Sequence, residues 1–132
     1  AIFSFGAHLS EAEQAVQQLE QQGVTVTLAD ARFAKPLDTD LIRQLAHNHE
    51  ALITIEQGSV GGFGAMVLHH LAATGQLDRG FKIRTMTLPD VYIDQASPSE
   101  MYATAGLTVQ DIERTALNLV RPAHNIVNLS QA

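Results

Sequence analysis

The chain has 132 residues, of which 45% are apolar, and this combination predicts one globular domain rather than a disordered segment. Its formal charge of −6 argues against nucleic acid or an anionic membrane as the main partner, and it has no apolar run near the roughly 20 residues that span a bilayer. The absence of cysteine excludes disulfides and thiolate chemistry and fits a reducing compartment, so we expect a cytoplasmic protein.

The first part of the chain predicts a strand, a helix and a second strand. Residues 2–5 (IFSF) form an apolar run that is typical of a buried strand. Ser10 and Glu13 have the spacing of a capping box, which predicts the start of an amphipathic helix, and Gly23 predicts its end. The β-branched run 24–28 (VTVTL) then predicts the second strand.

The middle of the chain repeats this alternation. A loop over residues 30–38 leads to a second helix, for which Asp38 or Thr39 is the expected N-terminal cap. Residues 52–55 (LITI) predict a third strand, which a glycine-rich segment connects to a third helix. Gly75 predicts the end of that helix.

The last part of the chain predicts one more strand and two helices. Residues 82–88 (KIRTMTL) alternate in polarity, which indicates a fourth strand. Residues 97–100 (SPSE) combine a capping box with proline at the first helical position and predict a short helix that ends at Gly106. Residues 108–111 (TVQD) predict the start of the last helix.

Strands that alternate with helices indicate an α/β fold, in which a parallel sheet has helices on both faces. We expect residues 1–120 to form this domain and residues 121–132, which show no hydrophobic period, to form a C-terminal tail. Ligands of such folds usually bind beyond the carboxyl ends of the strands, at the switch point of the strand order. The glycine-rich segment after the third strand lies at such an end.

This segment, residues 56–64 (EQGSVGGFG), either binds a phosphate or only turns the chain. It lacks the lysine and hydroxyl residue of a P-loop and the third glycine of the dinucleotide-binding pattern. Amides at the following helix start can hold an anion, but Glu56 lies just upstream and makes the local field negative. We therefore favour a tight turn. The candidate residues for an anion or interface loop are Glu56, Gly58, Ser59, Gly61, Gly62 and Gly64.

Few other residues show a pattern that indicates chemistry. His8 follows the first strand at the same sheet end as the glycine loop, so it is a further site candidate. The adjacent His69 and His70 diverge on a helix and do not predict a metal site. Asp30 and Glu56 both follow strands and can form a carboxylate pair for acid–base work, although such residues more often cap helices or pair with an arginine. We predict no catalytic constellation.

Residues 30–38 (DARFAKPLD) closely resemble a segment of the C-terminal, transketolase-like domain of 1-deoxy-D-xylulose-5-phosphate synthases. Further matching segments extend the resemblance over about residues 1–120, in the same order along the chain: residues 2–6 (IFSFG), 61–64 (GGFG), 88–90 (LPD), 101–102 (MY) and 105–107 (AGL). Two departures occur. Gln57 stands in place of a second glutamate, and residues 94–96 (DQA) stand where the family often has a His-Gly pair. Neither position is one that the family uses for chemistry.

The resemblance implies a place in a larger enzyme rather than an activity of this chain. Full-length members condense pyruvate with glyceraldehyde 3-phosphate, release carbon dioxide and form 1-deoxyxylulose 5-phosphate for isoprenoid, thiamine and pyridoxal synthesis. Their thiamine diphosphate, magnesium and catalytic residues belong to two preceding domains, whose motifs are absent here. We therefore expect no catalytic, cofactor-binding or metal-binding residue, no activity of the isolated fragment, and a role in packing against the remaining domains and in homodimerisation.

The resemblance also implies a three-layer α/β/α fold with a mixed, mainly parallel sheet. Ala1 stands just before a predicted strand, and the family's antiparallel edge strand would precede it, so we expect a fragment without that strand. The four remaining strands should be parallel in order 2-1-3-4, with His8 and the glycine loop on either side of the switch point. The missing strand leaves residues 24–28 as an edge, which should pair with a second copy or be covered by residues 121–132.

Two alternatives for function remain open from the sequence. One is a regulatory module that binds a small anion at the amides of residues 59–64. The other is the equivalent domain of a 2-oxo acid dehydrogenase β subunit, which would dock a lipoyl-carrying partner. Residues 32–38 argue against the second alternative, because related dehydrogenase chains differ there.

Overall fold

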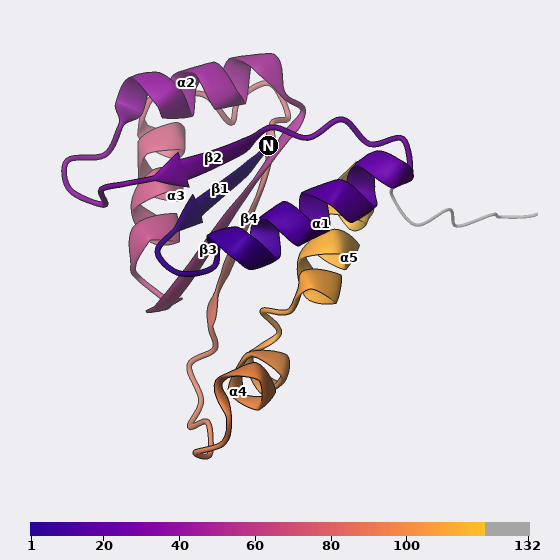
Figure 1. Cartoon of the computed structure of the whole chain (residues 1–132). Coiled ribbons are helices and arrows are strands. Elements are labelled where there is room, and N and C mark those ends of the chain that lie inside the picture. The colour runs from indigo at the N-terminus through magenta and orange to yellow at the C-terminus, as the bar shows by residue number, and fades with distance from the viewer. Residues whose placement is uncertain (121–132) are drawn as a thin grey trace, which may run out of the picture.

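The chain forms a four-stranded parallel sheet between two layers of helices, as seen in a computed structural model that describes residues 1–120 (Figure 1). The strands are β1 (Ile2–Phe5), β2 (Leu28–Ala31), β3 (Ala51–Ser59) and β4 (Lys82–Leu88). The helices are α1 (Leu9–Gln21), α2 (Thr39–Asn48), α3 (Phe63–Ala73), α4 (Pro98–Ala105) and α5 (Val109–Val120). The strand order is β2-β1-β3-β4, so the predicted α/β/α fold and strand order are confirmed. The predicted tail lies outside the described residues.

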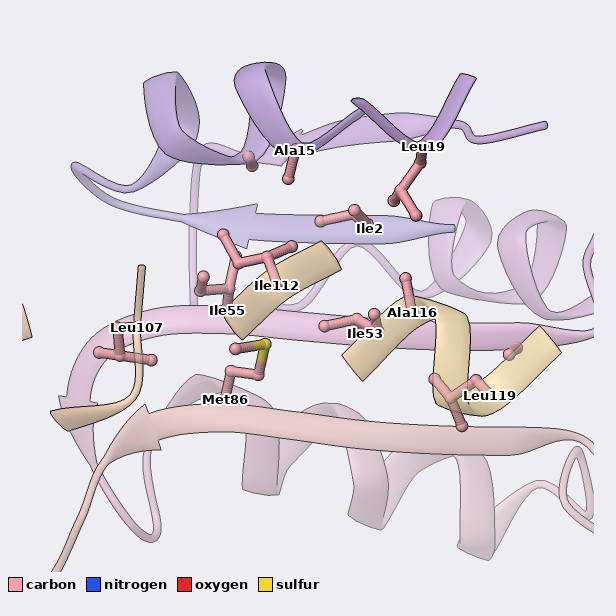
Figure 2. Packing of buried hydrophobic residues seen from close by; sticks show 12 residues of the cluster. Ile2, Ala15, Leu19, Ile53, Ile55, Met86, Leu107, Ile112, Ala116 and Leu119 are labelled. Carbon is pink, nitrogen blue, oxygen red and sulfur yellow. The ribbon is translucent and has the colours of Figure 1, made fainter. Parts of the chain in front are cut away.

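One core fills the space between the sheet and the helices α1 and α5, which lie side by side (Figures 1 and 2). Alternate strand residues point to this side, because successive side chains of a strand face opposite ways. The labelled side chains from the strands are Ile2, Ile53, Ile55 and Met86, and those from the helices are Ala15, Leu19, Ile112, Ala116 and Leu119. Each fully buried isoleucine or leucine contributes about 1.5–3 kcal/mol by leaving water.

The opposite face of the sheet packs against α2 and α3. Phe63 of α3 is central to this second core, since its ring lies 5.1 Å from that of Phe3 and 5.0 Å from that of Phe5. Burial of both faces explains why β1 and the first five residues of β3 are almost continuously apolar rather than alternating. Among the described residues no helix is both long and apolar enough to cross a membrane.

The predicted second strand was wrong in its position. Residues 24–27 form no strand, and β2 instead runs from Leu28 to Ala31, with Leu28 opposite Ile2. The amide of Val24 bonds the carbonyl of Leu19 and closes the end of α1, while Val24 also packs against the first core. The register with β1 therefore overrides the β-branched propensity of this run. Within residues 1–120, β2 is one of the two edge strands of the sheet, so the second strand lies at an edge, as predicted.

The predicted capping box of the first helix was also wrong. α1 begins at Leu9, one residue before Ser10, and His8 is its N-cap without a side-chain cap. The hydroxyl of Ser10 donates to the carboxylate of Glu11 instead. The spacing of Ser10 and Glu13 therefore forms no capping box, because the N-cap of the helix lies two residues before Ser10.

The other predicted helix ends are confirmed. Asp38 caps α2, because its Oδ1 accepts a bond of 3.0 Å from the amide of Leu41. Ser97 and Glu100 form both halves of a capping box on α4. The predicted helix-stop glycines all have positive φ: Gly23 (79°), Gly75 (73°) and Gly106 (73°).

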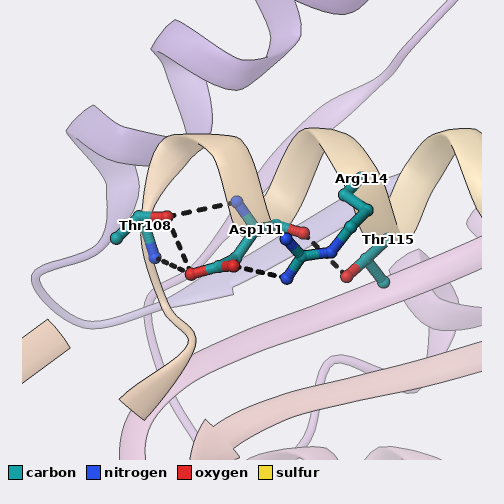
Figure 3. Close-up of polar contacts among 4 residues, drawn as sticks. All are labelled: Thr108, Asp111, Arg114 and Thr115. Atoms are coloured by element: carbon teal, nitrogen blue, oxygen red, sulfur yellow. Dashed lines mark hydrogen bonds and ion pairs between the residues drawn. The ribbon is translucent and has the colours of Figure 1, made fainter. Parts of the chain in front are cut away.

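A capping box of Thr108 and Asp111 starts α5 (Figure 3). The amide of Asp111 donates to Thr108 Oγ1 at 3.2 Å, and the amide of Thr108 donates to Asp111 Oδ2 at 3.0 Å. Arg114 also bonds the Asp111 carboxylate. Burial opposes the charged carboxylate, but the bonds from Thr108 and the Arg114 guanidinium outweigh it and hold the pKa of Asp111 below its ordinary value.

We expect Asp111→Ala to lower the free energy of unfolding by about 1 kcal/mol at pH 7, the usual value of a helix cap. Because the folded pKa is below the unfolded one, the carboxylate's stabilisation is present above the unfolded pKa and lost as pH falls through the folded pKa. The difference in unfolding free energy between wild type and variant should therefore be smaller at pH 3 than at pH 7. Urea unfolding at both pH values tests this, with the exposed Gln110→Ala as the control. An equal difference in unfolding free energy at both pH values would show that the charge of Asp111 does not contribute to stability.

Candidate functional site

The predicted glycine loop is shorter in the structure than in the sequence prediction. β3 continues through Glu56 to Ser59, and Ser59 pairs with Leu88 of β4 after a shift in register beyond Ile55. Pairing with the long strand β4 extends β3 into the segment that its glycine content assigned to a loop. Only residues 60–62 connect β3 to α3.

The carboxylate of Glu56 occupies the N-terminus of α3. Its Oε1 accepts a bond of 2.9 Å from the amide of Phe63, and its Oε2 accepts one of 2.5 Å from the amide of Gly64. These first-turn amides have no acceptor within the helix, and the helix dipole favours a negative charge beside them. Glu56 is only 2% exposed, so the anion at this helix start is the chain's own buried side chain.

The glycines make room for this carboxylate. A Cβ on Gly58 would lie 2.6 Å from Glu56 Oε1, and a Cβ on Gly62 would clash with the same atom. A Cβ on Gly64 would lie 2.7 Å from the hydroxyl oxygen of Thr54. Gly61 has a different role, because its φ of +98° is a conformation that other residues rarely adopt. Gly58, Gly62 and Gly64 therefore allow neighbouring side chains to approach the backbone closely, whereas Gly61 allows the backbone to turn.

The remaining loop candidate, Ser59, takes part in the turn through its backbone. Its carbonyl accepts a bond of 3.2 Å from the amide of Gly62, and its side chain is exposed. An external phosphate at this loop would have to compete with Glu56 for the amides of Phe63 and Gly64. The negative field of Glu56 is predictable from the sequence, but these two bonds are not, because they depend on how β3 meets α3.

His8 lies on the other side of the sheet from Glu56. It is 1% exposed, and its Nε2 lies 3.0 Å from the carbonyl oxygen of Leu107, which can only accept, so Nε2 carries a proton. The Tyr102 ring packs edge-on at 4.6 Å, and its hydroxyl accepts a bond from Gln57. Gln57 follows Glu56 along β3 and therefore faces the opposite way. His8 and the glycine loop thus do not line one crevice.

The proposed carboxylate pair is not formed either. Asp30 lies opposite Ser4 in the sheet, and Glu56 lies opposite Phe5. The neighbour of Asp30, Ala31, packs in the α2–α3 core, so Asp30 points toward the other face, whereas Glu56 bonds α3. Acid–base cooperation between these two carboxylates has no geometric basis.

The described residues do not fit thiamine diphosphate or magnesium. Within residues 1–120 no group of three or more histidines, aspartates and glutamates is placed to hold a metal ion. The amides at the α3 N-terminus, which would suit a diphosphate, already bond Glu56. Three surface hollows, around Ala1, around Arg79 and beside Phe33, are lined by neither His8 nor any candidate residue of the glycine loop.

Comparison with known proteins agrees with the fold. The family model "Transketolase, C-terminal domain" matches residues 1–112. The chain is 64% identical over 126 residues, or 96% of its length, to a 1-deoxy-D-xylulose-5-phosphate synthase of Rhodobacter capsulatus, and covers 20% of that protein. It is 66% identical over 117 residues, or 89% of its length, to 1-deoxy-D-xylulose-5-phosphate synthase 2 of Jannaschia sp. (strain CCS1), and covers 18% of it.

The chain therefore spans about a fifth of the length of the curated relatives that it matches. The family model covers most of the chain, and the parallel sheet between two helical layers has the strand order that the resemblance implied. We conclude that the chain belongs to the transketolase C-terminal domain family.

Proposed function

We propose that the chain is the non-catalytic C-terminal domain of a cytoplasmic, thiamine-diphosphate-dependent transferase that makes 1-deoxyxylulose 5-phosphate from pyruvate and glyceraldehyde 3-phosphate. The observation that carries this proposal is the 64% identity over 96% of the chain to a protein with the name of that enzyme. Such identity over nearly the whole chain argues against the alternative, a domain of a 2-oxo acid dehydrogenase.

The proposed role of the domain is to pack against the other domains of the enzyme and to support its homodimer. Two structural observations favour this role over a catalytic one. The carboxylate that follows β3 is buried and bonded to α3, and the histidine that follows β1 bonds a backbone carbonyl. Both predicted site candidates therefore stabilise the fold of this domain, while the chemistry and its cofactors belong to other parts of the polypeptide.

The same geometry speaks against a regulatory module that binds an anion at the glycine loop. Displacing Glu56 would leave a buried carboxylate without its two amide donors, at a cost of several kcal/mol. A free phosphate compound would have to offset that cost in addition to its own loss of hydration. We therefore infer that the loop binds no small anion with useful affinity.

An NMR titration of the chain tests the proposal. Magnesium thiamine diphosphate and then glyceraldehyde 3-phosphate, each at millimolar concentration, should leave the amide shifts of residues 59–64 and His8 unchanged. Saturable shifts at these residues would contradict the architectural role. In parallel, the complete polypeptide should form 1-deoxyxylulose 5-phosphate from the two substrates, and a complete polypeptide without this activity would overturn the enzymatic assignment.

A further inference from the structure

Large exposed apolar side chains gather at the carboxyl end of the sheet. Among residues 1–120, five such side chains are exposed, and four of them follow strands: Phe33 (69%) after β2, Val60 (69%) after β3, and Val91 (67%) and Tyr92 (89%) after β4. The carboxyl ends of parallel strands lie at one edge of the sheet, so these four residues form what we term the carboxyl-end rim. The fifth, Leu68 on α3, is only 38% exposed.

The helix beside this rim, α4, is only partly packed: Tyr102 and Ala105 contact the first core, and the rest of the helix faces outward. None of the eight residues of α4 is buried, and the helix lies beyond the end of β4, away from the sheet (Figure 1). Helices this short are marginal in water and normally depend on tertiary packing. α4 nevertheless has both a complete capping box and a left-handed glycine at its end, so it is built as a regular helix. Together, α4 and the rim indicate a surface that another protein surface covers.

The dimensions of the rim favour a macromolecule over a small ligand. Three inter-strand spacings of about 4.8 Å separate β2 from β4, so the strand ends that lead into the rim span roughly 14 Å. Charged residues border it, with Arg32 and Lys35 beside Phe33 and Asp90 and Asp94 beside Tyr92. An apolar centre with a charged border is typical of protein–protein interfaces. A hollow beside Phe33, lined by Pro36, Leu37 and Leu41 among others, offers space for a partner side chain.

We propose that the carboxyl-end rim and α4 dock against the remainder of the same polypeptide. The argument for this occupant is chain length, because the described domain corresponds to about a fifth of the relatives and the other four fifths supply a large neighbouring surface. The inference rests on the proposed function, since it requires that the chain is one domain of a longer protein. Exposed apolar patches of this kind are uncommon unless they serve binding.

Hydrogen–deuterium exchange on the complete polypeptide and on the isolated chain tests the docking. Backbone amides of residues 89–97 should exchange at least about tenfold more slowly in the complete polypeptide, since docking removes their contact with water. The loop over residues 74–80, at the opposite end of the sheet, should exchange alike in both. Equal exchange of residues 89–97 in both proteins would overturn the proposal.

Rim variants separate docking from folding. Tyr92→Ser and Val60→Ser should leave the melting temperature of the isolated chain unchanged, because both side chains are exposed, but should abolish the protection of residues 89–97 in the complete polypeptide. Leu68→Ser, an apolar-to-polar change away from the rim, is the matched control and should preserve that protection. Loss of protection with Leu68→Ser as well, or none with either rim variant, would contradict the proposal.

Sedimentation of the isolated chain tests whether a second copy of the chain, rather than the remainder of the polypeptide, covers the rim. We expect Tyr92→Ser to leave its oligomeric state unchanged, whereas a dimer that this variant dissociates would identify a second copy and overturn our assignment. The enzymatic assay of the wild-type polypeptide is independent of all these readouts. An inactive polypeptide with a protected rim would refute the proposed function alone, while an active polypeptide with an unprotected rim would refute the docking alone.

Discussion

Replacing Glu56 by glutamine is expected to lower the free energy of unfolding of the chain by about 2–4 kcal/mol. The carboxylate accepts bonds from the amides of Phe63 and Gly64, one on each oxygen. A glutamine side chain has one acceptor oxygen, so one of the two amides would face an NH₂ group inside a buried site. The substitution also removes the negative charge that the α3 dipole favours. Both losses act on the folded state only.

Urea unfolding at neutral pH measures this effect, and Glu20→Gln on the exposed side of α1 is the matched control. The control should remain within about 0.5 kcal/mol of wild type, as is usual for surface changes. A Glu56→Gln variant equally close to wild type would show that the two bonds contribute nothing to stability. Formate provides a second readout, because it should raise the melting temperature of Glu56→Ala, where it can replace the lost carboxylate, but not that of wild type.

The second large effect is expected for Gly62→Val. Of the two adjacent glycines 61 and 62, only Gly61 has a positive φ, at +98°. Gly62 has a φ of −85°, but a Cβ there would clash with Glu56 Oε1 and lie 3.3 Å from the Ser59 carbonyl oxygen. We expect a loss of at least about 3 kcal/mol, from overpacking and from the displaced carboxylate.

A double-mutant cycle distinguishes the two glycines. If Gly62→Ala acts by displacing the carboxylate, it should cost much less in a Glu56→Ala background, where the clash is absent. Gly61→Ala acts through backbone strain, has no atom near its Cβ, and should cost the same in both backgrounds. Thermal or urea unfolding of the six proteins gives the coupling energies. If the losses in unfolding free energy from Gly62→Ala and Glu56→Ala are additive, Gly62 does not make room for the carboxylate as we propose.

The elements that were predicted correctly are those that residues close together in the sequence determine. The caps of α2, α4 and α5 depend on residues three positions apart, and the stop glycines depend on their own φ. The strands β1 and β4 are apolar or alternating runs bounded by turn residues, so their sequence period sufficed. The strand order followed from the resemblance to a family, not from propensity, because no local signal specifies which strands are neighbours.

The errors arose where distant residues compete with local preference. The run 24–28 has the higher β propensity, yet β2 forms at residues 28–31 because the register with β1 places Leu28 opposite Ile2. Similarly, β3 extends into a glycine-rich segment because β4 is long enough to pair with it. No window of the sequence around either segment contains the partner strand that decides its bounds.

The sequence by itself determined the fold class, the helix boundaries with local caps and the family resemblance, because each rests on patterns within short stretches of chain. Only the tertiary structure decided the role of the glycine loop and of His8. A buried carboxylate, a helix start and three glycines become one unit only when β3 and α3 meet. The alternation of side chains along β3 then places Glu56 and His8 on opposite faces of the sheet, which divides one apparent site into two structural contacts.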